Sequence, residues 1–132
     1  MIYELLRIAK LCDRRNEWNE EEWIKTLTNC IVKGQYILKI KGKEIVAFSC
    51  WLFLKDLNKI DNHYVESPDG KIAYIQAAYV KNGNNGLLKN MIREGISRHK
   101  EGTHIFFCDD RLNNEKFLIP VEKWRRKVEL LV

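Results

Sequence analysis

The chain has 132 residues, of which 45% are hydrophobic and 31% are charged. This length and balance suit one compact core, so we expect residues 1 to 132 to form a single domain. No stretch approaches the roughly 20 apolar residues that cross a bilayer, and the first residues do not join a basic segment to an apolar one. We therefore expect a cytoplasmic protein without a membrane partner.

The formal net charge of +5 favours anionic partners, such as nucleic acid or a phosphorylated cofactor, without choosing between them. The densest basic cluster, residues 123 to 127, is short, and neither an RNA-binding signature nor a helix-turn-helix pattern accompanies it. The four cysteines are widely spaced without a C-x-x-C pair, which predicts buried free thiols. His99, His104 and Cys108 match no compact metal-binding spacing and lack a fourth ligand, so no metal site is predicted.

The first half of the chain predicts two helices and a hairpin. Apolar residues recur at three- and four-residue steps from Ile2 to Cys12, and a second helix has Asn19 as its N-cap and Gly34 as its end. Residues 36 to 40 and 44 to 54 then read as two strands around a short turn. Because the second strand is apolar at both odd and even positions, it should be a central strand that is covered on both faces.

The second half alternates strands, loops and a helix. We expect a loop at 55 to 70 and a strand at 71 to 80, then a loop at 81 to 86. A helix with one apolar face should start at Leu87 and end before Gly102, and a strand should follow at 103 to 108. A short helix at 113 to 117 completes the pattern. The tail after Pro120 favours helix, although residues 128 to 132 also fit a strand.

The loop between the strand at 71 to 80 and the following helix is the segment most suited to chemistry. Free N–H groups at a helix start attract anions, and glycines allow a phosphate to approach the backbone. The loop lacks the features of a Rossmann or a Walker motif. Its glycines and asparagines therefore predict either a pyrophosphate site or a simple turn.

This order of elements resembles the GNAT acetyltransferase superfamily across roughly residues 1 to 120, without the usual first strand. The resemblance implies an α+β, GNAT-like fold, with a mixed and mostly antiparallel sheet flanked by helices. It also implies that the glycine loop holds the pyrophosphate of acetyl-CoA or another acyl-CoA, and that an amine accepts the acyl group. In this sequence two residues separate Gly83 and Gly86, where the superfamily pattern has one.

The resemblance also implies which residues bind the cofactor. Lys81 would supply positive charge, and the small residues Ala77 and Ala78 would let the pantetheine lie along the strand. The predicted cofactor-binding residues are Ala78, Val80, Lys81, Gly83, Asn84, Asn85, Gly86, Leu87 and Asn113.

Transfer to an amine needs a base and a proton donor. The superfamily commonly places a Glu in the strand before the loop and a Tyr on the short helix, and Gln76 and Phe117 stand at those positions here. Tyr79 and Asp109 are therefore the catalytic candidates. Packing explains a strand tyrosine equally well, and a turn or cap explains an acid at a strand end.

A narrower resemblance concerns residues 34 to 51, where a Gln-Tyr strand precedes a glycine turn and a strand ending in Ser49-Cys50-Trp51. This stretch is similar to the toxin-activating lysine acyltransferases. That branch depends on an N-terminal His and a strand Asp, whereas the first histidine here is His63 and Gln76 stands at the acid position. Two functions remain open: an acyl-CoA N-acyltransferase, or a catalytically degenerate GNAT-like module that binds a protein or nucleic acid through its basic surface.

Overall fold

The protein is described by a computed structural model over residues 1–12, 19–56, 66–67, 69–82, 85–109, 115–123 and 125. Its helices and strands in chain order are α1 (Ile2–Cys12), α2 (Glu20–Val32), β1 (Tyr36–Lys41), β2 (Glu44–Leu54), β3 (Ile72–Val80), α3 (Asn85–Arg98), β4 (His104–Asp109) and β5 (Glu115–Pro120).

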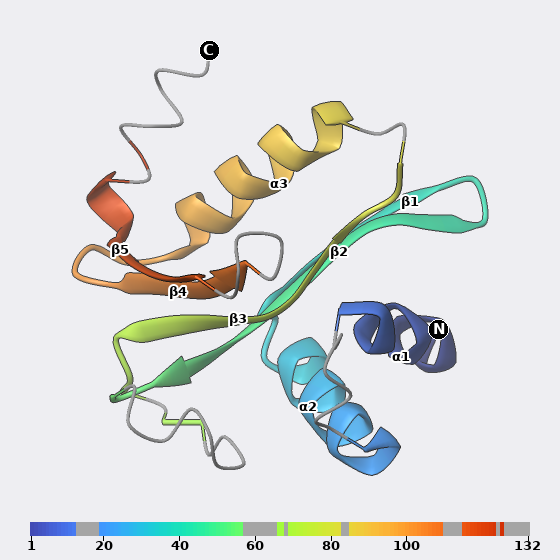
Figure 1. Ribbon diagram of the computed structural model, residues 1–132, viewed down its shortest axis with the longest axis horizontal. Helices are drawn as coiled ribbons and strands as arrows, with labels where there is room; N and C mark the ends of the chain where they lie inside the picture. Colours follow the sequence, from blue (N-terminus) through green and yellow to red (C-terminus); the bar gives the residue numbers. More distant parts are fainter. Residues whose placement is uncertain are drawn as a thin grey trace. The chain divides into compact units, whose positions relative to one another are not determined.

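The strands belong to one mixed sheet in the order β1-β2-β3-β4-β5 (Figure 1). β1 pairs with β2 and β4 pairs with β5 in antiparallel registers, whereas β3 and β4 are parallel. A mixed sheet combined with helices confirms the predicted α+β fold class. The chain divides into two compact units, Met1–Trp51 with Gln76–Leu88, and Leu52–Ile75 with Lys89–Val132.

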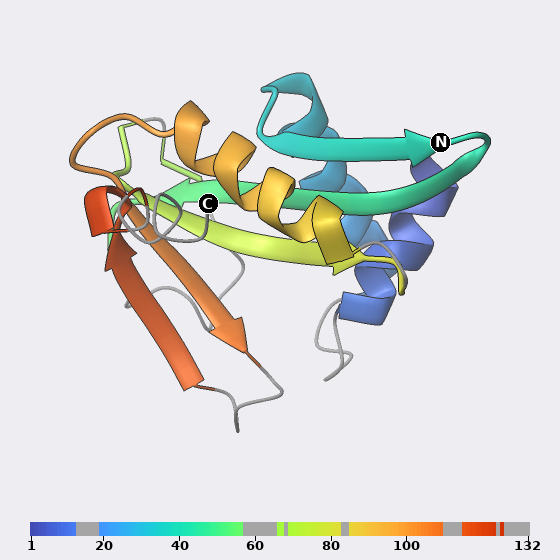
Figure 2. The same ribbon diagram turned by 90° about the horizontal axis from the view of Figure 1, so that it is seen from above.

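The first unit is built on the β1–β2 hairpin. Figures 1 and 2 show α1 and α2 together on one face of this hairpin. Leu5, Ile8 and Leu27 from the two helices are at most 1% exposed. β2 is buried at every position from Ile45 to Leu52, which confirms the prediction of a central strand covered on both faces.

Local sequence signals account for the bounds of α2. The Asn19 side chain accepts a hydrogen bond from the Glu22 backbone N–H at 2.9 Å, so the predicted N-cap is confirmed. Three glutamates occupy the first turn, where carboxylates complement the helix dipole. After Val32 the chain turns at Gly34, whose φ of 70° is the left-handed conformation that favours glycine.

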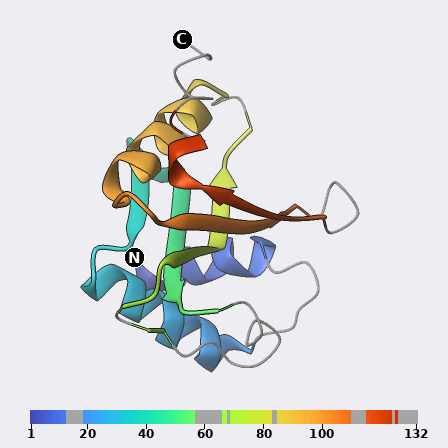
Figure 3. The same ribbon diagram turned by 90° about the vertical axis from the view of Figure 1, so that its left-hand side faces the viewer.

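The second unit packs α3 against β4. Ile96, Ile105 and Val121 form a buried cluster, and Ile75 of β3 packs against it. The parallel register joins Ile72–Tyr74 to His104–Phe106, and the Tyr74 and Phe106 rings stack at 5.3 Å. Figure 3 shows β4 and β5 side by side.

The short helix predicted at 113 to 117 is wrong. Glu115–Pro120 is instead the strand β5, whose register pairs Glu115 with Asp109 and Pro120 with His104. Hydrogen bonding to a neighbouring strand overrides the weak local helix signal of these residues. The predicted helix after Pro120 is present at residues 121–123, and residues 126–132 lie outside the described ones.

Three cysteines confirm the prediction of free thiols. Cys12 is partly buried, whereas Cys30 and Cys50 are fully buried. A hydrogen bond with Cys30, together with burial, raises the pKa of the Cys50 thiol well above its ordinary value. Within the described ranges, no cluster of three or more His, Cys, Asp or Glu residues could hold a metal ion. No helix in the described part of the chain is both long and apolar enough to cross a membrane.

Candidate functional site

The connection from β3 to α3 differs in one respect from the prediction. α3 begins at Asn85 and not at Leu87, so Gly86 lies in the first helical turn instead of the loop. A first-turn residue needs no intrahelical acceptor for its N–H, which makes a helix start tolerant of glycine. The predicted residues Gly83 and Asn84 lie outside the described ones.

Gly86 is not required by the backbone or by packing. A Cβ built at this position meets no heavy atom within 4 Å, and its φ is not in the left-handed range. Glycine inside a helix costs up to about 1 kcal/mol relative to alanine. α3 also has no acidic residue in its first turn. The first turn of α3 therefore carries no negative charge of its own.

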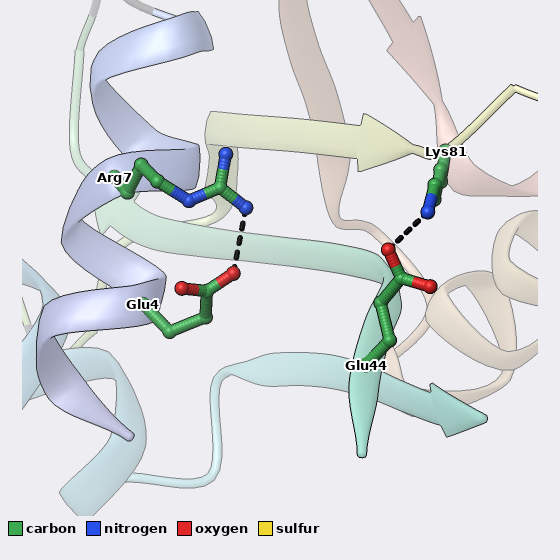
Figure 4. A network of polar contacts seen from close by, with 4 residues as sticks. All are labelled: Glu4, Arg7, Glu44 and Lys81. Atoms are coloured by element: carbon green, nitrogen blue, oxygen red, sulfur yellow. Dashed lines mark hydrogen bonds and ion pairs between the residues drawn. The ribbon is translucent and has the colours of Figure 1, made fainter. Parts of the chain in front are cut away.

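Lys81 is held at the end of β3 by two contacts. Its backbone N–H donates to the Val46 carbonyl at 2.8 Å. Its ammonium forms an ion pair with the Glu44 carboxylate at the start of β2 (Figure 4). The Lys81 and Glu44 side chains are 43% and 56% exposed, and ion pairs this exposed contribute at most about 1 kcal/mol.

A second ion pair lies on α1. Arg7 binds Glu4 at 2.6 Å, as Figure 4 also shows. The hydrogen bond to Glu4 raises the pKa of the Arg7 guanidinium, and the charges of Glu4, Tyr79 and Glu44 raise it further. Arg7 is therefore within electrostatic reach of both Tyr79 and Glu44.

A groove of about 480 Å³ adjoins this region. The groove lies beside a β-bulge. The register passes from Lys39 opposite Ala47 to Ile40 opposite Ile45, so Val46 is the extra residue of the bulge. The volume is in the usual range for small-molecule sites. The groove therefore joins the bulge, two lysines and the first turn of α3. Its lining residues are Leu38, Lys39, Ile40, Lys41, Val46 and Leu87.

Several predicted site residues lie together in the first unit. Ala78 is exposed, and its carbonyl accepts a hydrogen bond from the Cys12 thiol at 3.5 Å. Tyr79, Val80, Lys81 and Leu87 are partly buried. Asn85 provides the first residue of α3.

The remaining candidates fall elsewhere. Asp109 ends β4 in the second unit, and its side chain is not among those described. Asn113 also lies outside the described residues. The roles of Tyr79 and Asp109 therefore stay predictions.

Gln76 on β3 has a buried side-chain oxygen that has no hydrogen-bond partner in the described structure. A buried acceptor left without a donor costs about 1 to 3 kcal/mol. Such a group commonly marks a place where water or a ligand donates a hydrogen bond. As a neutral carboxamide, Gln76 offers hydrogen bonds but no base.

The residues behind the narrower resemblance make structural contacts. The Gln35 side chain is buried and donates to the Trp51 carbonyl at 2.9 Å, and the Cys30 thiol donates to the same carbonyl at 3.3 Å. These bonds close the end of the β1–β2 ladder. The similarity to toxin-activating acyltransferases stays a prediction.

Sequence reasoning missed Glu44, Arg7 and the two groove lysines. Glu44 follows the turn at Gly42 and looks like an ordinary strand-end charge. Only the placement of the end of β3 beside the start of β2 shows that it meets Lys81. The bulge that forms the groove has no sequence signal that we recognise.

Three solved structures share this fold. The loading GNATL domain of CurA from Lyngbya majuscula has a TM-score of 0.58 and 13% identity, over 85% of this chain and 63% of that one. The GphF GNAT-like decarboxylase in complex with isobutyryl-CoA has a TM-score of 0.58 and 11% identity, over 85% of this chain and 64% of that one. A predicted acetyltransferase with acetyl-CoA from Clostridium acetobutylicum has a TM-score of 0.50 and 20% identity, over 84% and 76%.

The chain thus spans less than two thirds of the length of the first two of these structures. No protein-family model matches the sequence, and no curated protein matches it either.

Proposed function

We propose, from the premise that this chain has the GNAT fold, that it binds an acyl-CoA and transfers the acyl group to an amine. Two of the similar structures are complexes with CoA thioesters, one with isobutyryl-CoA and one with acetyl-CoA. Acetyl-CoA is therefore the first donor to test. The acceptor class is an amine, as in N-acyl transfer generally.

Gly86 carries this proposal. Neither packing nor backbone geometry requires a glycine there, and the helix start lacks its own carboxylate. A diphosphate placed against the first turn would accept hydrogen bonds from N–H groups of that turn and gain from the helix dipole. The absence of a Cβ at Gly86 leaves room for this approach.

The surrounding residues supply charge and volume. Lys81 is the last cation before the helix start, and its side chain is partly exposed. The groove beside Leu87 places Lys39 and Lys41 on its wall, which suits a further anionic part of the same cofactor. In this proposal Ala78 offers an exposed, small side chain along which the pantetheine arm would lie.

Calorimetric titration of the whole chain tests cofactor binding. We expect acetyl-CoA, isobutyryl-CoA and free CoA each to bind and to raise the melting temperature. Gly86→Glu should weaken all three, and Asn90→Glu, which adds the same charge at an exposed position of α3, should not. No heat and no thermal shift with any of the three would contradict the proposal.

Transfer is tested separately, by release of the CoA thiol in the presence of amines. A polyamine, a lysine peptide and an amino sugar cover three acceptor shapes. A carboxylated donor, malonyl-CoA, belongs in the same assay because one of the similar structures is a decarboxylase. Thiol release that depends on the amine would support transfer.

A second function, binding without transfer, is favoured by Gln76. This residue is a carboxamide and cannot take a proton from the attacking amine. CoA binding without amine-dependent thiol release would favour this second function. If CoA fails to bind, whereas DNA or RNA binds with strong salt dependence, the basic surface is the functional one.

A further inference from the structure

The ammonium of Lys81 is already paired with a carboxylate in the unliganded protein. Its ammonium is paired with Glu44, the first residue of β2. Both side chains are partly exposed, so the pair is worth at most about 1 kcal/mol. A ligand anion therefore has to compete with Glu44, but the competition costs little.

Arg7 carries a second positive charge within electrostatic reach of the Glu44 carboxylate. The charge of Glu44 contributes to the raised pKa of Arg7, so the two groups interact across α1 and β2. Arg7 is itself bound to Glu4 at 2.6 Å. Figure 4 shows these four side chains projecting from three neighbouring elements. They form two separate ion pairs, Arg7 with Glu4 on α1 and Lys81 with Glu44 at the ends of β3 and β2.

The backbone of Lys81 need not move for its ammonium to change partner. Its N–H remains bound to the Val46 carbonyl at 2.8 Å, which fixes the strand end. Rotation of the flexible lysine side chain is sufficient. A diphosphate carries more negative charge than a carboxylate, and it accepts charge-assisted hydrogen bonds from an ammonium as a carboxylate does.

On the basis of the proposed function, we infer that Glu44 competes with a ligand anion for the ammonium of Lys81. A bound diphosphate takes the ammonium from Glu44, and the released carboxylate turns to Arg7. Glu44 thereby lowers the affinity of anions that use Lys81, and a diphosphate, which draws on the ammonium most, loses most. It acts as an autoinhibitory contact and does not touch the reacting atoms.

The test measures CoA affinity by calorimetry in a cycle of variants of the full chain. Glu44→Gln should tighten CoA binding about twofold to fivefold, the range expected from losing one exposed ion pair. Glu94→Gln is the matched control, because it removes the same charge from an exposed pair with Arg98. This control should leave the affinity unchanged.

Arg7→Gln completes the cycle. It should weaken CoA binding in the wild-type background, because Glu44 then has no second partner. In the Glu44→Gln background it should have no effect. If Arg7 acts directly on the phosphate, the loss will be equal in both backgrounds, and the inference is wrong.

Inorganic pyrophosphate and acetate serve as probes of the charge preference. Removal of the competitor should raise the affinity for pyrophosphate more than that for acetate, so the ratio of pyrophosphate to acetate affinity should rise in Glu44→Gln. If CoA binds the wild type but Glu44→Gln leaves its affinity unchanged or lowers it, the exchange is overturned and the proposed function stands. If CoA binds neither protein, both the proposed function and the exchange are overturned.

Discussion

The two helix starts at Glu20 and Asn85, both in the first unit, are built in opposite ways. α2 is capped by the Asn19 side chain and carries three glutamates in its first turn. α3 starts at Asn85 with a glycine at the next position and no acid in its first turn. The α2 start thus has a side-chain cap and acids that complement its dipole, whereas the first turn of α3 has no acid.

The difference separates a structural helix end from one that is suited to a ligand. At the α2 start, Asn19 caps the Glu22 N–H and Glu20 pairs with Lys10. At the α3 start, Gly86 has open space around it, and Lys81 lies four residues before the helix. Substitutions at the two ends should therefore have opposite effects on stability and on binding.

The largest expected effect concerns His99, at the C-terminal end of α3. His99 follows the helix and is 5% exposed, with Phe53 against its ring. Burial, together with the charges of Arg125 and Arg98, lowers the pKa of His99 to about 4. The unfolded chain therefore takes up a proton near pH 6.5, whereas the folded protein resists it until about pH 4.

Stability should consequently fall as the pH falls through this window. The loss attributable to His99 is on the order of 3 kcal/mol. Urea unfolding at several pH values measures it, and the difference between the wild type and His99→Gln isolates this residue from the carboxylates. Parallel pH profiles of the two proteins would show that His99 is not the cause.

The next effect opposes the two helix starts directly. Gly86→Glu gives α3 a carboxylate like those of α2, and it should raise the Kd for CoA at least about tenfold, since charge-assisted hydrogen bonds to a phosphate are worth roughly 1.5 to 3 kcal/mol. Calorimetry on this variant and on Asn90→Glu measures the change. Equal affinities for the two variants would remove the distinction between the helix starts.

Asn19→Ala should produce the converse result. Loss of the cap destabilises the protein by about 1 kcal/mol, because the Glu22 N–H loses its acceptor. The affinity for CoA should not change. Chemical unfolding and a CoA titration of the same sample provide both values, and a weaker CoA complex would mean that α2 takes part in binding.

The smallest effect is a gain in stability. Gly86→Ala should stabilise the unliganded protein by about 0.5 to 1 kcal/mol, because alanine fits the open space and restricts the unfolded chain. The same change should weaken CoA binding. A destabilised variant would show that Gly86 is needed by the fold, and the contrast with α2 would then lose its basis.

Local signals in the sequence predicted much of the fold. The period of α1, the Asn19 cap and the two-sided burial of β2 depend on neighbouring residues, and all are confirmed. The order of these elements also predicted the GNAT-like fold, which the similar structures confirm. β5 was missed because pairing with β4, and not local preference, decides its conformation.

The candidate site was less predictable. The strand, loop and helix around Lys81 and Gly86 could be found from the glycines and the change of period. The pairing of Lys81 with Glu44 could not, because it depends on which strand ends lie side by side. The groove beside Val46 depends on one unpaired strand residue, and a change in register leaves no trace in composition.

The extra residue at Val46 has a consequence for how this surface can be lost. Deleting one residue there would let the two arms of the hairpin pair without interruption. The wall of the groove would disappear, and the carbonyl that receives the Lys81 N–H would move with it. A single in-frame deletion could therefore erase the surface and leave a folded chain, an outcome that few single substitutions would produce.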